Sequence, residues 1–258
     1  MNFVAAGLSD VGLQREHNED SFCILSKHRL FVVADGMGGH RAGDIASRMA
    51  TAEISTFFDV TDTRDGETSD WPLELDARLT AEQNRLVSAV KVANQRIFQA
   101  SIGNKAVQGM GTTVVGALFT RDDRKIHIAH VGDSRAYRVR DGDIVQLTRD
   151  HSLLNDYLLV MPNLTDAQRD RLPTNVITRA LGMQDGVAVD LYFERVEPGD
   201  TYVLCSDGLN GMISDAEILG IVQDADTDIE SATKTLISEA NGKGGEDNIT
   251  VVLVRITE

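Results

Sequence analysis

Short segments of alternating or continuous apolar residues recur in both halves of the chain, and this pattern is typical of β-strands. It predicts strands at Phe3–Gly7, Ser21–Ser26, Leu30–Ala34, Thr112–Phe119, Lys125–Val131, Ser134–Arg140, Asp143–Leu147, Val187–Arg195, Thr201–Ser206 and Ile249–Arg255. Between two of them, the Asp141-Gly142 pair predicts a tight hairpin turn. The chain is therefore expected to be rich in antiparallel strands joined by short turns.

Apolar residues at helical spacing mark the remaining regular elements. They predict helices at Ala42–Phe58, Leu79–Ala100, Ser214–Gln223 and Ile229–Ala240. Residues 152–176 differ, because an apolar helical segment ends at Pro162-Asn163 and a charged segment follows, which we interpret as a small flap beside a site. Hairpin-linked strands with grouped helices indicate an α+β fold, a β-sandwich of two antiparallel sheets flanked by pairs of helices. The length suits a single domain spanning residues 1–258.

Several of these apolar segments end in an aspartate beside a glycine. Asp35-Gly36, Gly132-Asp133 and Asp207-Gly208 each follow a predicted strand, whereas Asp247 precedes one and follows a glycine-rich stretch. One such pair is usually only a turn. However, buried strands lie side by side, so carboxylates at their ends can meet, and unpaired buried carboxylates repel one another unless a cation lies among them. The combination predicts an oxygen-ligated Mg²⁺ or Mn²⁺ site.

Charge and targeting patterns narrow the partners and the compartment. The net charge is −15, from 25 basic and 40 acidic residues, which argues against nucleic acid or an anionic membrane as the main partner. The first residues lack the pattern of a signal peptide, and no stretch reaches the roughly 20 apolar residues of a membrane span. We expect a cytoplasmic protein. The six histidines show no metal-binding spacing, and His127 and His130 should face opposite sides of one strand.

A charged segment precedes the second predicted strand and supplies a candidate for binding phosphate. It reads Arg15-Glu16-His17-Asn18-Glu19-Asp20. Charge runs of this kind are usually solvated loops. Beside a metal cluster, however, the planar guanidinium of Arg15 would suit the oxygens of a phosphate group.

These segments together resemble a known family, the metal-dependent protein phosphatases of the type 2C serine/threonine class, in its bacterial form. The matching blocks follow the family's order and are Arg15–Phe22, Val33–His40, Gly111–Gly116, His130–Tyr137, Leu147–Ser152, Asn175–Gly182, Leu204–Leu209 and Gly245–Val254. Any one block would be a weak signal, but together they span nearly the whole chain. The resemblance implies the same sandwich fold, with a binuclear Mg²⁺ or Mn²⁺ centre at one end.

The resemblance also implies roles for individual residues. Asp35 would bridge the two metals and the Gly36 carbonyl would bind one of them, while Asp207 and Asp247 would hold the other. Asp133 would hold a third, weaker ion together with Asp207. The full set of implied metal-site residues is Asp35, Gly36, Asp133, Asp207, Asp247 and, acting through water, Glu19 or Asp20. Arg15 would contact the substrate phosphate, and two divalent ions would lower the pKa of a water molecule between them.

The proton donor for the leaving group has more than one candidate. Many eukaryotic members carry a histidine directly after the Asp-Gly pair, where this chain has Met37. His40 is close in sequence, and a water molecule near Asp133 is another candidate. In the flap, Arg171-Leu172-Pro173-Thr174 lacks the histidine that bacterial members often have there.

The expected function is hydrolysis of phosphoserine and phosphothreonine in proteins, with a eukaryotic-like Ser/Thr kinase or its targets as partners and a monomer as the active form. One alternative is a related metal-dependent phosphohydrolase that acts on a small phosphorylated molecule. Another is a catalytically silent signalling or scaffold domain of the same fold. The retained acidic residues argue against the last reading, because carboxylates held together without a cation are costly.

Overall fold

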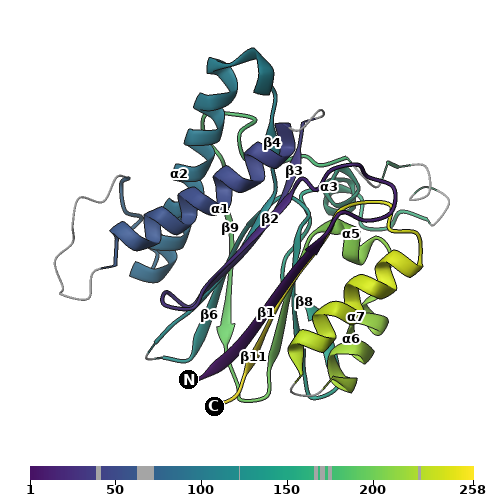
Figure 1. Ribbon diagram of the computed structural model, residues 1–258. Coiled ribbons are helices and arrows are strands. Elements are labelled where there is room, and N and C mark those ends of the chain that lie inside the picture. Colours follow the sequence, from purple (N-terminus) through teal and green to yellow (C-terminus); the bar gives the residue numbers. More distant parts are fainter. Residues whose placement is uncertain are drawn as a thin grey trace.

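The computed structural model describes residues 1–38, 42–62, 73–121, 123–165, 168, 172–173, 176–225 and 228–258. Its strands form two antiparallel sheets (Figure 1). The first sheet contains, in spatial order, β1 (Phe3–Asp10), β11 (Ile249–Ile256), β10 (Thr201–Cys205), β7 (Arg135–Arg140) and β8 (Asp143–Gln146). The second contains β2 (Asp20–Leu25), β3 (Leu30–Met37), β5 (Val114–Phe119), β6 (Lys125–Val131) and β9 (Asp190–Arg195), and the short β4 (Gly111–Thr112) pairs with β3.

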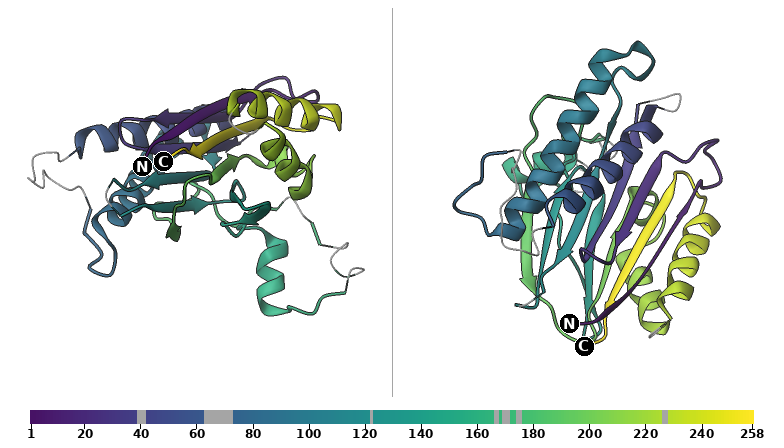
Figure 2. Two further views of the ribbon diagram at one scale, coloured as in Figure 1. Left: turned by 90° about the horizontal axis from the view of Figure 1, so that it is seen from below. Right: turned by 60° about the vertical axis from the view of Figure 1, so that its left-hand side comes forward.

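Two helix pairs cover the outer faces of these sheets, so the layers run helix, sheet, sheet, helix (Figure 2). Helices α1 (Ala42–Val60) and α2 (Ala81–Gly103) pack on the second sheet, and α6 (Asp215–Asp224) and α7 (Ile229–Gly242) pack on the first. Capping boxes begin α2 at Thr80 and α6 at Ser214 and satisfy backbone N–H groups of the first turn. The predicted α+β sandwich is therefore confirmed.

The hydrophobic core has three layers that follow from the strand pattern. Each central strand is apolar on both faces, because one face meets the other sheet and the opposite face meets a helix pair. In β3, for example, Phe31 and Val33 pack between the sheets, whereas Leu30 and Val32 pack beneath α1 and α2. This arrangement holds the strand ends in fixed positions, and those ends carry the acidic residues.

The predicted element boundaries are close to the observed ones, with two main differences. The expected strand Thr112–Phe119 is interrupted at Thr113, because the backbone N–H and the hydroxyl of Thr113 both bond to the backbone of Asp35. The expected strand Val187–Arg195 begins only at Asp190. In the Asp141–Gly142 hairpin both residues have positive φ, as a tight turn between twisted strands requires.

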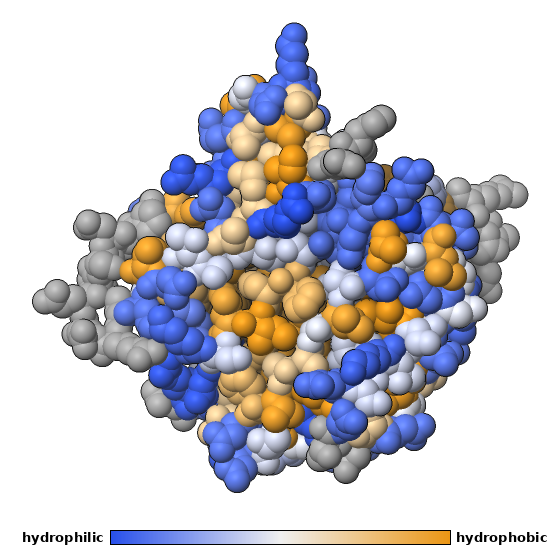
Figure 3. All heavy atoms as spheres, in the orientation of Figure 1, coloured by the Kyte–Doolittle hydropathy of each residue, from blue (hydrophilic) through white to orange (hydrophobic). Residues whose placement is uncertain are grey.

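Smaller elements complete the described part of the chain. Helix α3 (Leu153–Val160) falls in the expected flap and projects from the sandwich (Figure 2). Helix α5 (Asp207–Asn210) is a single turn after β10, and a 3-10 turn spans Lys105–Val107. Figure 3 shows apolar side chains on the face between the helix pairs. Val4 and Leu8 of β1 are partly exposed. None of the described helices has the length and apolar character needed to cross a membrane.

Candidate metal centre

Five aspartates gather at one end of the sandwich, opposite the chain termini (Figure 1). Asp20 begins β2 and is the cross-strand partner of Asp35 in β3. Asp207 opens α5 directly after β10, Asp247 precedes β11, and Asp133 lies in the turn between β6 and β7. The carboxylates of Asp20, Asp207, Asp133 and Asp247 all repel that of Asp35. The structure therefore brings together five carboxyl groups that are far apart in sequence.

Burial and mutual repulsion make these groups resist ionisation. Burial is the main cause that raises the pKa of Asp133 to about 7, and the charge of Asp207 adds to it. Burial also raises the pKa of Asp20 to about 7, although hydrogen bonds from Thr250 and Ser206 partly offset the increase. The pKa of Asp35 lies well above its usual range for the same two reasons. Ionisation of the cluster is therefore unfavourable unless a cation offsets the negative charge.

The oxygen atoms in this cluster fit a hard divalent cation. The Oδ1 atoms of Asp20, Asp133 and Asp207 are buried and have no hydrogen-bond partner. Buried polar atoms normally have a hydrogen-bond partner, so three unpaired carboxylate oxygens in one cluster indicate a binding site for a cation. Carboxylate oxygens are the ligands that suit Mg²⁺ or Mn²⁺. Bound divalent ions would lower the pKa of each coordinating carboxyl.

The backbone around Asp35 is fixed by hydrogen bonds and close packing. Thr113 donates its backbone N–H to the Asp35 carbonyl at 2.8 Å and accepts the Asp35 N–H on its hydroxyl at 3.1 Å. The Thr113 hydroxyl also bonds to that of Ser134 at 2.6 Å, which links Asp35 to the turn that carries Asp133. A Cβ atom on Gly36 would lie 2.1 Å from the Gly43 carbonyl oxygen, so only glycine fits there.

Asn248 joins the N-terminal loop to the strand that follows Asp247. Its side-chain amide donates to the carbonyls of Val11 and His17, at 2.9 and 3.0 Å. Its side-chain oxygen accepts the backbone N–H of Glu19 at 2.8 Å. All of these bonds reach across the sequence, so Asn248 fixes where residues 11–19 lie relative to the cluster. The sequence pattern did not single it out.

Arg15 lies at the rim of the cluster. Its Nη2 atom is 2.6 Å from Asp247 Oδ2, and the two side chains are 52% and 36% exposed. The loop that carries Arg15 is held because the N–H groups of Leu13 and Gln14 donate to the Gly245 carbonyl at 2.7 and 3.2 Å. Gly245 has a φ of +51°, and a Cβ there would lie 2.9 Å from the Leu13 nitrogen. The glycine-rich stretch before Asp247 thus permits the close approach that places Arg15.

A polar cavity of about 480 Å³ opens onto the cluster. Arg15, Asp133, Asp207 and Asp247 all line it. Its wall also contains Arg135, whose guanidinium makes a bidentate pair with Asp150 at 2.7–3.1 Å. This volume accommodates a phosphorylated side chain, and its lining offers both carboxylates and the half-exposed guanidinium of Arg15.

The remaining residues expected at the site have different placements. The Glu19 carboxylate lies at the start of α1, since a Cβ on Gly43 would be 2.7 Å from Glu19 Oε2. Asp20, and not Glu19, is among the carboxylates with the largest effects on Asp35. Met37 lines a second cavity, of about 450 Å³, together with Arg179 and Met183. His40 lies outside the described residues, as do Arg171 and Thr174 of the flap.

One polar cluster near the centre was missed by the sequence analysis. His130 of β6, His151 and Asp190 of β9 come together from three separate segments. The expectation that the histidines make no pairing of metal-binding type rested on spacing along the sequence, and spacing does not reveal this cluster. The alternation of His127 and His130 in β6 gave no sign of it either, because the partner of His130 comes from a loop.

Comparisons with known proteins agree on one family. The family model described as protein phosphatase 2C matches residues 14–240. The serine/threonine phosphatase stp of Listeria innocua is 38% identical over 251 residues, covering 95% of this chain and 93% of the relative. Protein phosphatase PhpP of Streptococcus pneumoniae is 37% identical over 256 residues, covering 97% and 96%.

Solved structures share the fold over nearly the full length. The serine/threonine phosphatase PstP/Ppp of Mycobacterium tuberculosis superposes with a TM-score of 0.83 at 32% identity, covering 99% of both chains. A structure of the PstP catalytic domain in complex with two manganese ions has a TM-score of 0.80 at 32% identity and covers 99% of both chains.

Proposed function

The chain belongs to the protein phosphatase 2C family and is a metal-dependent serine/threonine protein phosphatase, and from this we propose that the aspartate cluster and Arg15 are its active site. The observation that carries the proposal is the set of three buried, unpartnered Oδ1 atoms on Asp20, Asp133 and Asp207. A structural cluster would pair these atoms with donors. A metal centre would leave them free for cations.

We propose that Mn²⁺ or Mg²⁺ occupies this cluster. Asp35 would contribute to both of two ion sites, the Gly36 carbonyl to one of them, and Asp207 and Asp247 to the other. The PstP complex with two manganese ions supports this number for a relative. Asp133, with Asp207, would hold a third, weaker ion. Of the two acidic residues that could act through water, Asp20 has the stronger support, because its carboxylate repels that of Asp35.

The bound ions would lower the pKa of a water molecule and offset negative charge on the phosphate. The protein's own residues would orient the substrate. Arg15 is held at the rim by Asp247 and would donate two parallel N–H groups to phosphate oxygens. Since Asp247 already pairs with this guanidinium, the arginine would be held in place before the substrate arrives. The reaction needs no covalent intermediate on the chain, and neither cysteine lies in a phosphate-binding loop.

The substrates would be phosphoserine and phosphothreonine proteins made by a eukaryotic-like Ser/Thr kinase. Support for the protein substrate comes from the names of the relatives, and support for the kinase comes from the family resemblance alone. We further propose that one catalytic domain spans residues 1–258, that the flap at residues 152–176 contributes to substrate choice, and that the enzyme acts as a cytoplasmic monomer.

A phosphopeptide assay tests the site. Purified protein with Mn²⁺ should hydrolyse a phosphothreonine peptide and lose activity in EDTA, and Asp207→Ala should remove most of the activity. Asp143→Ala, in the exposed hairpin, serves as a matched control and should keep it. Full activity of Asp207→Ala would disprove the metal assignment. Faster turnover of nucleotides or sugar phosphates than of any phosphopeptide would favour a small-molecule phosphohydrolase instead.

A further inference from the structure

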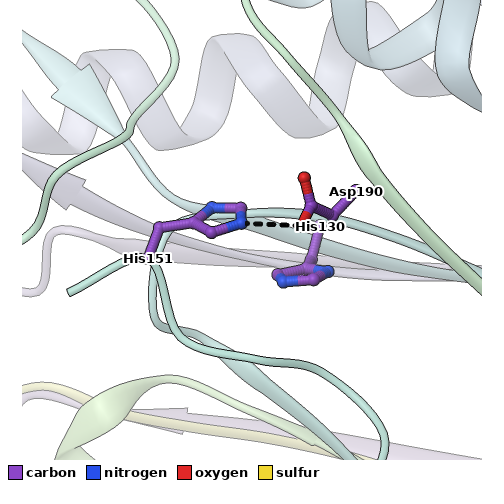
Figure 4. A group of neighbouring side chains, drawn as sticks. All are labelled: His130, His151 and Asp190. Atoms are coloured by element: carbon purple, nitrogen blue, oxygen red, sulfur yellow. Dashed lines mark ion pairs between the residues drawn. The ribbon is translucent and has the colours of Figure 1, made fainter. Parts of the chain in front are cut away.

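His130 and His151, which are buried, form a group with the partly exposed Asp190 near the metal centre (Figure 4). Two histidines and a carboxylate within 4.8 Å could be taken for a second metal site. However, the imidazole rings are stacked, with centroids 4.7 Å apart and planes inclined by only 15°. A metal ion lies in the plane of each imidazole that binds it, and two stacked, nearly parallel rings cannot both point at one ion. The group must have another role.

Hydrogen bonds fix the tautomer of His151. The backbone N–H of Gly132 donates to His151 Nδ1 at 3.0 Å, so Nδ1 must carry a lone pair. The proton of the neutral ring is therefore on Nε2, which lies 3.3 Å from Asp190 Oδ2 (Figure 4). An imidazolium form would place an N–H against the Gly132 N–H, and burial together with the neighbouring His130 lowers the pKa of His151. The ring is thus a neutral acceptor aimed at the backbone of Gly132.

This acceptor forms half of a two-bond clamp. The backbone N–H of His151 donates to the Gly132 carbonyl, also at 3.0 Å. Both polar groups of the Gly132 backbone are therefore held by His151, a residue that is 1% exposed. On the other side, a Cβ on Gly132 would lie 2.6 Å from Thr113 Cβ, and the φ of Gly132 is +107°. Gly132 is confined between Thr113 and His151, and the next residue is Asp133.

A second layer holds His151 itself. The carbonyl of His151 accepts the N–H of Thr178 at 2.8 Å. Asp190, which faces Nε2, is paired with Arg179 Nη1 at 2.6 Å, and the same guanidinium donates to the Ala188 carbonyl at 3.1 Å. The His130 ring stacks on that of His151 and is itself fixed because Nε2 donates to the Arg149 carbonyl at 3.0 Å. The imidazole has little freedom to move away from Gly132.

We propose that His151 is a positioning residue for Asp133, and that its Nδ1 atom orients the Gly132–Asp133 turn for the weaker metal site. The inference rests on the proposed role of Asp133 as a ligand for a third ion. The Oδ1 atom of Asp133 is buried and has no partner, so no hydrogen bond to that atom fixes the direction of the carboxylate. The position of the carboxylate then depends on where the Gly132–Asp133 backbone lies. Residues that orient metal ligands commonly affect metal affinity by about 10- to 100-fold.

Two substitutions separate the hydrogen bond from the rest of the side chain. His151→Asn places an amide oxygen near the position of Nδ1 and keeps an acceptor for Gly132. His151→Gln reaches the position of Nε2 and leaves the Gly132 N–H without an acceptor. We expect His151→Gln to weaken the lowest-affinity Mn²⁺ site by about 10- to 100-fold in titration calorimetry, with the tighter sites changed less than about threefold. His151→Asn should stay within about threefold of the wild type at every site.

Two controls make the result specific. His127→Gln makes the same change at another buried histidine, which lies against Gln83 and away from the aspartates, and should leave Mn²⁺ binding unchanged. Asp133→Asn should itself abolish the weak site. If Asp133→Asn has no effect on Mn²⁺ binding, the proposed role of Asp133 fails. If Asp133→Asn abolishes the weak site and His151→Gln leaves it intact, the inference about His151 is overturned.

The wild-type protein offers an independent measurement that does not depend on the folding of any variant. Nitrogen NMR of the metal-free and Mg²⁺-bound forms at neutral pH should show His151 protonated at Nε2 and unprotonated at Nδ1. Mg²⁺ at concentrations that fill the weak site should slow hydrogen exchange of the Gly132 amide. A proton on Nδ1, or equal losses of weak-site affinity in His151→Asn and His151→Gln, would contradict the proposal.

Discussion

Removing one charge from the metal centre should stabilise the protein when no metal is bound. Asp133→Asn keeps the shape of the side chain and removes its charge. The pKa of Asp133 is raised from 3.8 to about 7 in the folded protein, chiefly by burial and then by Asp207. The unfolded chain therefore loses this proton near pH 4 and the folded protein only near pH 7. Between these values the folded state binds more protons, so its stability falls as the pH rises.

The size of this effect follows from the shift. Each pKa unit corresponds to about 1.4 kcal/mol, so ionised Asp133 costs the metal-free fold about 4 kcal/mol at pH 7.5 and less than about 2 kcal/mol at pH 5. Burying the new amide costs about 1–3 kcal/mol at both pH values, and this cost reduces the stability gained by removing the charge. Asp133→Asn should therefore gain about 1–3 kcal/mol at pH 7.5. The gain should be about 2.5 kcal/mol smaller at pH 5, and this difference does not depend on the cost of burying the amide.

Urea unfolding in EDTA at pH 5 and pH 7.5 measures the gain in stability of Asp133→Asn at each pH and the difference between the two gains. Asp59→Asn is a contrasting control, because hydrogen bonds from His28 and Lys27 lower the pKa of Asp59. Removal of the Asp59 charge should not stabilise the protein at neutral pH. With saturating Mn²⁺ the wild type should be more stable than Asp133→Asn, since metal binding stabilises the wild type more than the variant. An equal gain at the two pH values, or a loss at pH 7.5, would refute the reasoning.

Two further substitutions test the rim and the backbone of the centre. Arg15→Gln should lower kcat/KM for a phosphothreonine peptide by about tenfold or more, because charge-assisted hydrogen bonds contribute about 1.5–3 kcal/mol. Mn²⁺ binding, measured by calorimetry, should not weaken. An unchanged kcat/KM would exclude the phosphate contact. Gly36→Ala should cost about 3 kcal/mol or more in chemical unfolding, because its Cβ would lie 2.1 Å from Gly43 O and 2.5 Å from Glu19 O. Gly103→Ala, with no atom within 4 Å, should have little effect, and similar results for the two would contradict the packing argument.

Most of the fold could be predicted from the sequence because the information is local. Apolar periodicity distinguishes strands from helices, and a strand that is apolar on both faces must be covered on both faces, which leads to a layered sandwich. The interruption at Thr113 could not be read in this way. Its side chain and backbone bond to Asp35, far away in sequence, and nothing in the run from Thr112 to Phe119 reports that contact.

The centre could be predicted only in part, for a related reason. Aspartates at strand ends meet because strands lie side by side, so the gathering of Asp35, Asp133 and Asp207 follows from sheet geometry. The placement of Arg15 against Asp247 depends instead on loop backbone, above all the positive φ of Gly245. Whether Glu19 or Asp20 faces the cluster depends on the exact start of β2. Rotamers and loop paths are set by tertiary contacts that sequence spacing does not encode.

The rigidity of this end of the molecule explains why charge repulsion persists there. Carboxylates on flexible loops would move apart and relieve their repulsion, and their pKa values would stay ordinary. Here Gly36 and Gly208 have backbone atoms against them that leave no room for a side chain, with hypothetical Cβ contacts of 2.1 Å in each case, and Asn248 ties the N-terminal loop to the same place. The fold therefore holds the carboxylates in position before any cation arrives. Part of the metal-binding free energy should come from relieving this repulsion, so variants of the centre that lose metal affinity are expected to gain stability in the metal-free state.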